Sequence, residues 1–542
     1  MNSLFIALIG IVLIVAGYII YGKKLEKLWE VDPEKPTPAF TCRDNCDYIP
    51  AKNWFVLFGH HFSSIAGAAP ILGPVIAVAA WGWLPALLWV VFGTIFIGGV
   101  HDFSSLMVSV RYKGESVATV AEELLGKRLR LVLSFFLWVT LVLIIAVFAA
   151  VTAQTLEVQP EMVIPTFGLI LNAVLVGYLL YHRNGPYPAV TVLGLLILVF
   201  LVIFGYQFPI LLPSAGKSWT AILLVYCLIA SVTPVNILLQ PRDYLSAFLL
   251  FFGLLAGLLG LFLVHPVMNT PAYIGFKSET GILWPMLFVT IACGAISGFH
   301  SLVASGTSSK QLPSERDARK IGYGAMAAEG VLAVIAIMAV AAGLKWQGTG
   351  LTYPVLMKDK GWIPTFAAGY QVITRPILGG KGDLVAMLIL NGFVLTTLDT
   401  ATRICRYIGQ ELFGTGLKIK PFKNNYFATV IPLILAAYLA FGNWKVVWPV
   451  FGAANQLIAA LVLLLVSCYL LSRKKPINTT LLPAIVMLIT TVFALGYQTN
   501  KFYHTGKYLL GNISLLLLVL AIYVTYQTTR FIVTHRNLPR KA

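Results

Sequence analysis

Apolar runs long enough to cross a lipid bilayer recur along almost the whole of this 542-residue chain. A helix needs roughly 18 or more apolar residues to span a hydrocarbon core of roughly 30 Å, and about fifteen such runs can be drawn here. Hydrophobic residues make up 58% of the sequence and charged residues only 11%, a composition far from that of soluble domains. The sequence therefore predicts an all-α polytopic protein with about fifteen transmembrane helices in a lipid bilayer.

The distribution of basic residues predicts an orientation in the membrane. The chain has 39 Lys and Arg residues against 21 Asp and Glu, a formal net charge of +18. Most of the Lys and Arg residues fall in alternate loops between the predicted helices, which is the positive-inside pattern and explains the charge without a nucleic-acid partner. We expect a multi-pass protein of the cell (inner) membrane with its N-terminus outside, its C-terminus cytoplasmic and an odd number of spans.

Three of the apolar runs are interrupted by glycine, proline and hydroxyl residues. They are "FGHHFSSIAGAAPILGP" (58–74), "LIASVTPVNILLQ" (228–240) and "CGAISGFHSLVASGTSSK" (293–310). Freed backbone groups are tolerated at membrane depth only where protein or a water-filled cavity satisfies them. Interrupted helices of this kind are typical of secondary transporters built from inverted repeats, in which they form the binding site.

The spacing of the interrupted runs predicts how the chain is divided. Counting from the run at 54–80, the sixth helix is the run at 218–239, which contains the second interruption. A spacing of five helices is that of a 5+5 inverted repeat whose first and sixth helices are both discontinuous. The predicted parts are an additional helix with a cytoplasmic loop (1–53), two five-helix repeats (54–212 and 213–410) and four additional helices (411–542).

The first interrupted run carries two adjacent histidines. On a helix, residues at i, i+4 and i+7 share a face, so His60 is aligned with Ser64 and Gly67, whereas His61 is aligned with Ala68. We expect His60 to be functional and His61 to be mainly structural, the alternative for each being an imidazole satisfied by a backbone carbonyl. Unwound backbone around Gly67 and Ala68 offers free carbonyls to a cation and free amides to an anion.

An aspartate lies inside a predicted membrane helix in "GGVHDFSS". Asp102 follows His101 and shares a helix face with Ser105. Charged groups are costly at this depth, so an intramembrane aspartate by default indicates a proton or ion pathway. The alternative is that Asp102 pairs with a basic residue and orients two helices.

The other two interrupted runs supply further candidate residues for a substrate or ion pathway. A serine stripe with the imidazole of His300 beside it suits either sodium, which hydroxyls and carbonyls bind, or a proton. Small residues at such spacing also serve close helix packing. In the second run, half-helix ends near Thr233 and Asn236 would face a substrate carboxylate. The candidates from these two runs are Thr233, Asn236, His300, Ser301, Ser305 and Thr307.

Two charged motifs predict ion pairs at helix ends. "QPRDYL" contains Arg242 next to Asp243, and "TTLDTATRICRY" places Asp399 and Arg403 at i and i+4, a spacing at which opposite charges attract. Each pair can lock a helix end or form part of an inner gate. Asp399 lies deeper in its predicted span and is the stronger candidate for the substrate or ion pathway.

The cysteines and the known enzyme motifs provide little chemistry. Cys42 and Cys46 form a C-x3-C pair in a predicted cytoplasmic loop, which is only half of a structural zinc site. We expect reduced thiols there and treat Cys42, Cys46, His60 and His61 as weak metal candidates. The chain contains no Walker A motif, no H-E-x-x-H and no nucleophile elbow, so we expect a protein that is not an enzyme and holds no cofactor.

Five motifs together resemble the carbon starvation protein A (CstA) family. They are "LFGHHFSSIAGAAPILGP", "GGVHDF", "QPRDYL", "SGFHSLVASGTSSKQL" and "TTLDTATRICRYIGQEL". The resemblance implies membership of the amino acid/polyamine/organocation superfamily and a LeuT-like core. It implies uptake under nutrient (carbon) starvation, of peptides in some members and of pyruvate with protons in others, at times with a small cytoplasmic accessory protein. The resemblance also implies, by position within these motifs, that the family's candidate site residues correspond to His60, His61, Asp102, Asp243, His300 and Asp399.

These observations predict a secondary active transporter that imports peptides or a small carboxylate such as pyruvate by proton symport. His60, Asp102 and His300 are then the protonation candidates. Two alternatives remain open, namely sodium-coupled uptake and a metal-binding membrane sensor or channel-like protein. The sequence leaves open the choice between peptide and pyruvate and the oligomeric state.

Overall fold

Long helices make up the protein, and their ends are set by the same signals that interrupt the apolar runs. The computed structural model describes residues 2–44, 47–235, 237–348, 352–442 and 444–536. Two residues that the sequence singles out, Cys46 and Asn236, lie outside the described ranges. Within those ranges thirteen helices are long and apolar enough to cross a membrane. The shorter α19 and the interrupted pair α13–α14 add two crossings, in agreement with the about fifteen predicted.

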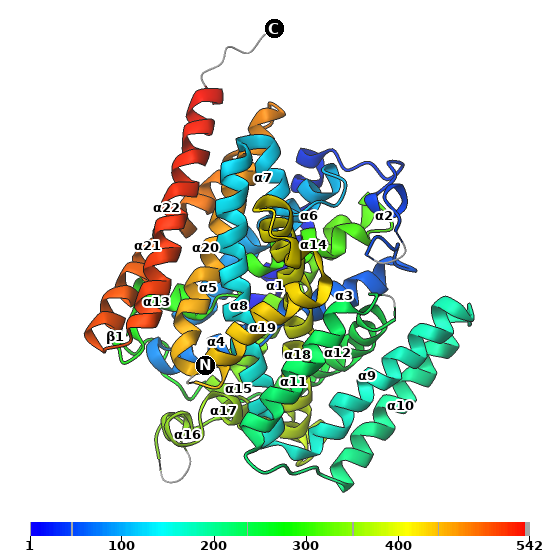
Figure 1. Ribbon diagram of the computed structural model, residues 1–542. Helices are drawn as coiled ribbons and strands as arrows, with labels where there is room; N and C mark the ends of the chain where they lie inside the picture. Colours follow the sequence, from blue (N-terminus) through cyan, green and yellow to red (C-terminus); the bar gives the residue numbers. More distant parts are fainter. Residues whose placement is uncertain (1, 45–46, 236, 349–351, 443, 537–542) are drawn as a thin grey trace.

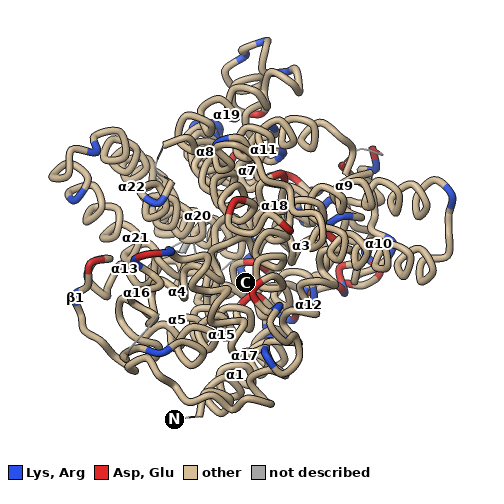
Figure 2. Tube along the Cα trace, turned by 90° about the horizontal axis from the view of Figure 1, so that it is seen from below, with Lys and Arg blue, Asp and Glu red and all other residues tan. Residues whose placement is uncertain are grey.

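The chain ends lie on opposite faces of the bundle. The N-terminus is at the lower face in Figure 1, and the C-terminal helix rises past the upper face. Seen from below, α10 and α22 lie at opposite edges of the bundle (Figure 2). The continuous crossings are α1 (Ser3–Trp29), α5–η1–α6 (Trp83–Arg111), α8 (Lys127–Val158), α9 (Val163–Gly177) with η3 (Tyr178–His182), α10 (Tyr187–Gln207), α11 (Ala215–Val232), α12 (Leu239–Val264), α15 (Ala325–Gly343), α18 (Gly382–Gly409), α19 (Asn425–Ala440), α20 (Trp444–Ser472), α21 (Asn478–His504) and α22 (Tyr508–Arg536).

The first interrupted helix is where the sequence predicts it. Helix α3 (Trp54–Ala66) ends at Gly67, whose φ of 52° is in the left-handed region that favours glycine, and α4 (Ala69–Trp81) begins after Ala68. A side chain at Gly67 would also crowd the Phe148 ring and the Thr397 hydroxyl, at 3.1 and 3.3 Å. The break is therefore held by α8 and α18 as well as by its own sequence.

Of the other two runs predicted to be interrupted, only the third contains a break within a crossing. The run at 228–240 is a connection between helices, because α11 ends at Val232 and α12 begins at Leu239. Thr233 is extended, as expected for a residue before proline. The third run, predicted to be interrupted at 293–310, does contain a break, at residues 291–297, between α13 (Leu283–Thr290) and α14 (Gly298–Gly306).

The two interrupted helices are in close contact. A side chain at Gly73 of α4 would lie 2.5 Å from the carbonyl oxygen of Thr290, at the end of α13. Helix α14 packs against α3, α6 and α20, while α3 packs against α12 and α18. The two breaks therefore lie at the centre of the bundle.

Shorter elements close the two faces. On the face of the N-terminus, the hairpin of β1 (Lys277–Ser278) and β2 (Gly281–Ile282) lies near α16 and α17 (Figure 1). On the opposite face, the amphipathic segment at 115–130 forms a short surface helix followed by the start of α8. The shorter helices are α2 (Pro38–Thr41), α7 (Val117–Leu125), η2 (Pro160–Met162), η4 (Ser308–Lys310), η5 (Glu315–Asp317), η6 (Lys320–Gly324), α16 (Tyr353–Asp359), α17 (Trp362–Leu378), η7 (Gln410–Gly416) and η8 (Lys420–Lys423).

Candidate functional site

Two histidines share one buried aspartate beside the second break. His300 of α14 places its Nδ1 2.7 Å from Oδ2 of Asp102, and His101 places its Nδ1 2.7 Å from Oδ1 of the same carboxylate. Glu329 of α15 lies on the other side of the His300 ring, and all four side chains are fully buried. We call these four residues the histidine–carboxylate cluster. Asp102 therefore pairs with histidines on its own helix and on α14, so the geometry leaves open both a proton pathway and the alternative that Asp102 orients two helices.

The cluster needs a proton between His300 and Glu329. Nε2 of His300 lies 3.3 Å from Oε2 of Glu329, and neither carboxylate oxygen of Glu329 has a hydrogen-bond partner among the described residues. A neutral His300 that donates from Nδ1 to Asp102 would point the lone pair of its Nε2 at the carboxylate of Glu329. The buried negative charge of Glu329 would then have no hydrogen-bond donor, which is costly. A proton shared by His300 and Glu329 removes the conflict, because either an imidazolium or a protonated Glu329 then supplies the missing donor.

An asparagine on α20 holds the second break in shape. The Asn455 side chain accepts hydrogen bonds from the backbone N–H of Phe299 (2.8 Å) and from the hydroxyl of Ser297 (3.2 Å). Its amide nitrogen lies 3.4 Å from the sulfur of Cys293. Sequence reasoning missed Asn455, although an amide within the apolar run at 446–471 is a readable signal.

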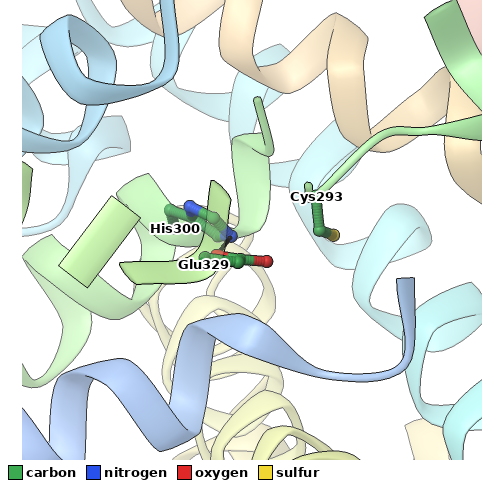
Figure 3. A group of neighbouring side chains, drawn as sticks. All are labelled: Cys293, His300 and Glu329. Atoms are coloured by element: carbon green, nitrogen blue, oxygen red, sulfur yellow. Dashed lines mark ion pairs between the residues drawn. The ribbon is translucent and has the colours of Figure 1, made fainter. Parts of the chain in front are cut away.

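A group of side chains that shares two residues with the cluster has the composition of a metal site. Cys293, His300 and Glu329 offer ligand atoms that all lie within 4.8 Å of one another (Figure 3). Sulfur, nitrogen and oxygen donors suit a transition-metal ion. A proton, however, satisfies His300 and Glu329 without a third donor. Among the described residues, no such group includes the predicted metal candidates Cys42, His60 or His61.

A second buried network surrounds Arg242 on α12. The guanidinium forms ion pairs with both Asp243 and Asp399. Tyr226 of α11 donates to Asp399 (2.7 Å), and His60 of α3 places its Nδ1 2.6 Å from Asp243. We call these five residues the arginine–aspartate network. Two carboxylates face one guanidinium, so a protonated His60 would balance the charge of the network.

The structure corrects one predicted ion pair. Asp399 pairs with Arg242 from another helix, and not with Arg403 on its own helix. The Arg403 guanidinium instead donates to the carbonyls of Ala230 (2.7 Å) and Thr233, and it lies 3.6 Å from the carboxylate of Asp47. Its long side chain reaches the C-terminal end of α11, where unpaired carbonyls attract cations. The Thr233 carbonyl accepts from Arg403, and its hydroxyl donates to the carbonyl of Ile229 (2.9 Å). Both groups are therefore engaged at the C-terminal end of α11, where the sequence predicted a half-helix end that faces a substrate carboxylate.

The remaining polar residues of α3 fasten it to its neighbours. His61 lies 2.7 Å from the Ser308 hydroxyl, and the Ser64 hydroxyl lies 3.4 Å from that of Thr400. Thr397 donates to the carbonyl of Ser64 (2.9 Å). These contacts fix the end of α3 just before the unwound Gly67 and Ala68.

The serine stripe of α14 is bonded within its own helix. The hydroxyls of Ser301, Ser305 and Thr307 donate to the carbonyls of Gly298 (2.6 Å), Ser301 (2.8 Å) and Val303 (3.0 Å). This pattern of bonding to the preceding turn is common for Ser and Thr in membrane helices. These three hydrogen bonds do not converge on one point, whereas the side chains of the cluster beside them do.

The fold and the site define a class of protein. A bundle with two interrupted helices at its centre matches the crystal structure of a mutant manganese transporter from Eremococcus coleocola. The TM-score is 0.53 at 12% sequence identity, over 90% of this chain and 99% of that one. The chain therefore has the predicted LeuT-like fold of secondary transporters.

The chain belongs to the CstA family, since the family model described as "Carbon starvation protein CstA" matches residues 2–354 and 349–494. It is 31% identical to the "Peptide transporter CstA" of Campylobacter jejuni, over 95% of this chain and 82% of that protein. It is 31% identical to the "Pyruvate/proton symporter BtsT" of Escherichia coli, over 94% and 84%, and 34% identical to the "Peptide transporter CstA" of that species, over 92% and 81%. The protein is thus a multi-pass membrane transporter and not an enzyme, as predicted.

Proposed function

We propose that this transporter imports a small carboxylate-bearing solute, pyruvate or a peptide, together with a proton under carbon starvation. The observation that carries the proposal is the 3.3 Å distance between Nε2 of His300 and Oε2 of Glu329, which one proton can bridge. Among the described residues, neither carboxylate oxygen of Glu329 has a hydrogen-bond partner. The same cluster includes Asp102 on α6 and lies next to the break between α13 and α14. Proton binding there is therefore coupled to the shape of the central break.

Protonation and conformation are linked through the elements that carry the cluster. His101 and Asp102 belong to α6, His300 to α14 and Glu329 to α15. With the proton bound, these three helices are held by two ion pairs. When it is lost, the His300 lone pair faces a carboxylate, which favours separation of α14 from α15. The other titratable side chains near the cluster are His61 and Cys293.

The break in α3 is the proposed position of the substrate carboxylate. The backbone unwinds at Gly67 and Ala68, and α4 begins at Ala69 with Pro70 in its first turn. The N–H groups of a first helical turn attract anions. Because the arginine–aspartate network fastens α3 to α12 through His60 and Asp243, it is the proposed inner gate.

A transport assay tests the coupling ion and the substrate together. Purified protein in liposomes is given labelled pyruvate or labelled dialanine, with the pH gradient and the sodium gradient imposed separately. We expect accumulation against a concentration gradient when the outside is acidic, in the absence of sodium. Accumulation that depends on sodium and ignores the pH gradient would contradict the proposal and support sodium coupling.

The orientation and the repeat boundaries are also proposals. The positive-inside pattern supports an N-terminus outside and a C-terminus in the cytoplasm, where a small accessory protein would bind. Helix α3 packs against α12, and α14 packs against α20. If α3 and α14 belong to the first helices of two repeats, and α12 and α20 are the last, the same contact occurs once in each repeat. These contacts support a second repeat that begins at α13, and not at residue 213, with α9 and α10 as a peripheral insertion. Cysteines introduced near either terminus, labelled with an impermeant maleimide in intact cells, test the orientation.

A further inference from the structure

A cavity on the face of the N-terminus lies next to the two interrupted helices. Its volume is about 750 Å³. Ile76 of α4 and Thr290 at the end of α13 form part of its floor, and both belong to the interrupted helices. The walls come from the β1–β2 hairpin, α16, α17, α20 and α21. The cavity therefore lies next to Thr290, the last residue of α13 before the second break.

Four lysines from four different segments surround this cavity. They are Lys277 of β1, Lys358 of α16, Lys445 of α20 and Lys501 of α21. Glu279 is the one acidic residue among the lining side chains of the described ranges. The lysine ion pairs found in the described part of the chain involve Lys320 and Lys475, so none of these four is neutralised by a carboxylate. We call this space the lysine-lined cavity.

The walls between the lysines are apolar and aromatic. Trp362 and Trp448 meet edge to face with ring centroids 5.7 Å apart, and Lys445 lies 5.9 Å from the centroid of the Trp362 ring. Unpaired cations around a cleft with low-dielectric walls focus the field and raise the local concentration of anions. Apolar walls also favour a solute that has a hydrocarbon part. Both features match a small monocarboxylate anion.

We propose that the lysine-lined cavity is an outer binding site that selects small monocarboxylate anions, of which pyruvate is one, over zwitterionic peptides. The cavity attracts a solute with net negative charge. It gains little from a peptide, because the peptide's ammonium group is repelled by the lysines that attract its carboxylate. This inference rests on the proposed uptake of a carboxylate-bearing solute and on the proposed orientation, and it narrows the substrate class.

The test replaces the four lysines by glutamine together (K277Q, K358Q, K445Q and K501Q) and uses the corresponding fourfold Lys→Arg variant as the control. Initial rates of labelled pyruvate uptake into liposomes are measured at low and at high ionic strength. We expect the KM of the glutamine variant for pyruvate to rise about tenfold at low salt. We expect its maximal rate to be unchanged, and the arginine variant to behave like the wild type.

The wild-type protein provides a second measurement that does not depend on folding of the variant. Its KM for pyruvate should rise when salt screens the lysines, while its KM for dialanine should not. An equal KM in wild type and glutamine variant, or a wild-type KM that is independent of salt, would overturn the inference. A wild type that accumulates neither pyruvate nor dialanine in a pH gradient would instead overturn the proposed function.

Discussion

Nε2 of His300 lies 3.3 Å from Oε2 of Glu329, and both side chains are fully buried between α14 and α15. Such an approach is stable only when a proton or another cation lies between the two atoms. Replacement of Glu329 by glutamine removes the carboxylate and keeps the size of the side chain. We therefore expect E329Q to lose pH-driven accumulation of pyruvate by about tenfold or more, while it retains exchange of pyruvate across the liposome membrane.

The control for E329Q is E157Q, the same substitution at the exposed end of α8. It should accumulate pyruvate as the wild type does. Full accumulation by E329Q in the same pH gradient would rule out Glu329 as part of the coupling site.

Asp102 is the shared acceptor of His101 and His300. In D102N one of the two imidazoles loses its acceptor in a fully buried position, and the charge that stabilises an imidazolium is gone. We expect the free energy of unfolding to fall by about 3 kcal/mol, measured as a lower thermal midpoint of the detergent-solubilised protein. D359N, on the exposed end of α16, should leave the midpoint unchanged, and a D102N midpoint equal to that of the wild type would contradict the prediction.

Arg242 and Asp399 should show strong thermodynamic coupling. Each single variant, R242Q or D399N, leaves a buried charge with an incomplete set of partners, whereas the double variant removes both. A double-mutant cycle on unfolding is therefore expected to give an interaction energy on the order of 3 kcal/mol. Additive effects of the two substitutions would show that the pair does not act as a unit.

Arg403 should matter for the end of α11 and little for proton coupling. Its guanidinium binds the carbonyls of Ala230 and Thr233, so R403Q removes charge-assisted hydrogen bonds that are each worth about 1.5–3 kcal/mol. We expect faster hydrogen exchange at the end of α11, together with pH-driven accumulation within about twofold of the wild type. Unchanged exchange at residues 226–233 would refute this role.

Metal removal separates the proton from a metal as the occupant of the cluster. Since a proton satisfies His300 and Glu329 without Cys293, we expect purified protein to contain no stoichiometric transition metal and uptake to resist chelators. C293A should then transport as the wild type does. Stoichiometric metal that disappears in C293A would instead support the metal-binding alternative.

Local signals in the sequence were sufficient for most of the helices and for the first break. The apolar runs have the length of a membrane span, and Gly67 with Pro70 marks a place where a helix cannot continue. The break predicted at 228–240 was wrong because Pro234 looks the same in sequence whether it interrupts a helix or ends one, whereas the run at 293–310 was correctly predicted to be interrupted. The true break at 291–297 depends on Asn455, more than 150 residues further along the chain.

Part of the candidate site was predictable by the same reasoning. Asp102 and His300 stand out as polar residues inside membrane helices, and they are in contact. Glu329 carries an equally strong signal, a lone acid in the apolar stretch "AMAAEGVLAV", but it was overlooked. The predicted partner of Asp399 was wrong because the i, i+4 rule considers one helix at a time, whereas Arg242 approaches from another helix.

The opposite placement of the two termini has a consequence for protein engineering. Under the proposed orientation, two copies of this chain cannot be joined head to tail by a simple flexible linker, because α22 of the first copy ends on the face of the bundle opposite to the face where α1 of the second copy begins (Figure 1). A tandem fusion would require one extra membrane-crossing helix in the linker. If the proposed orientation holds, a fluorescent protein at each end would likewise report on two different compartments.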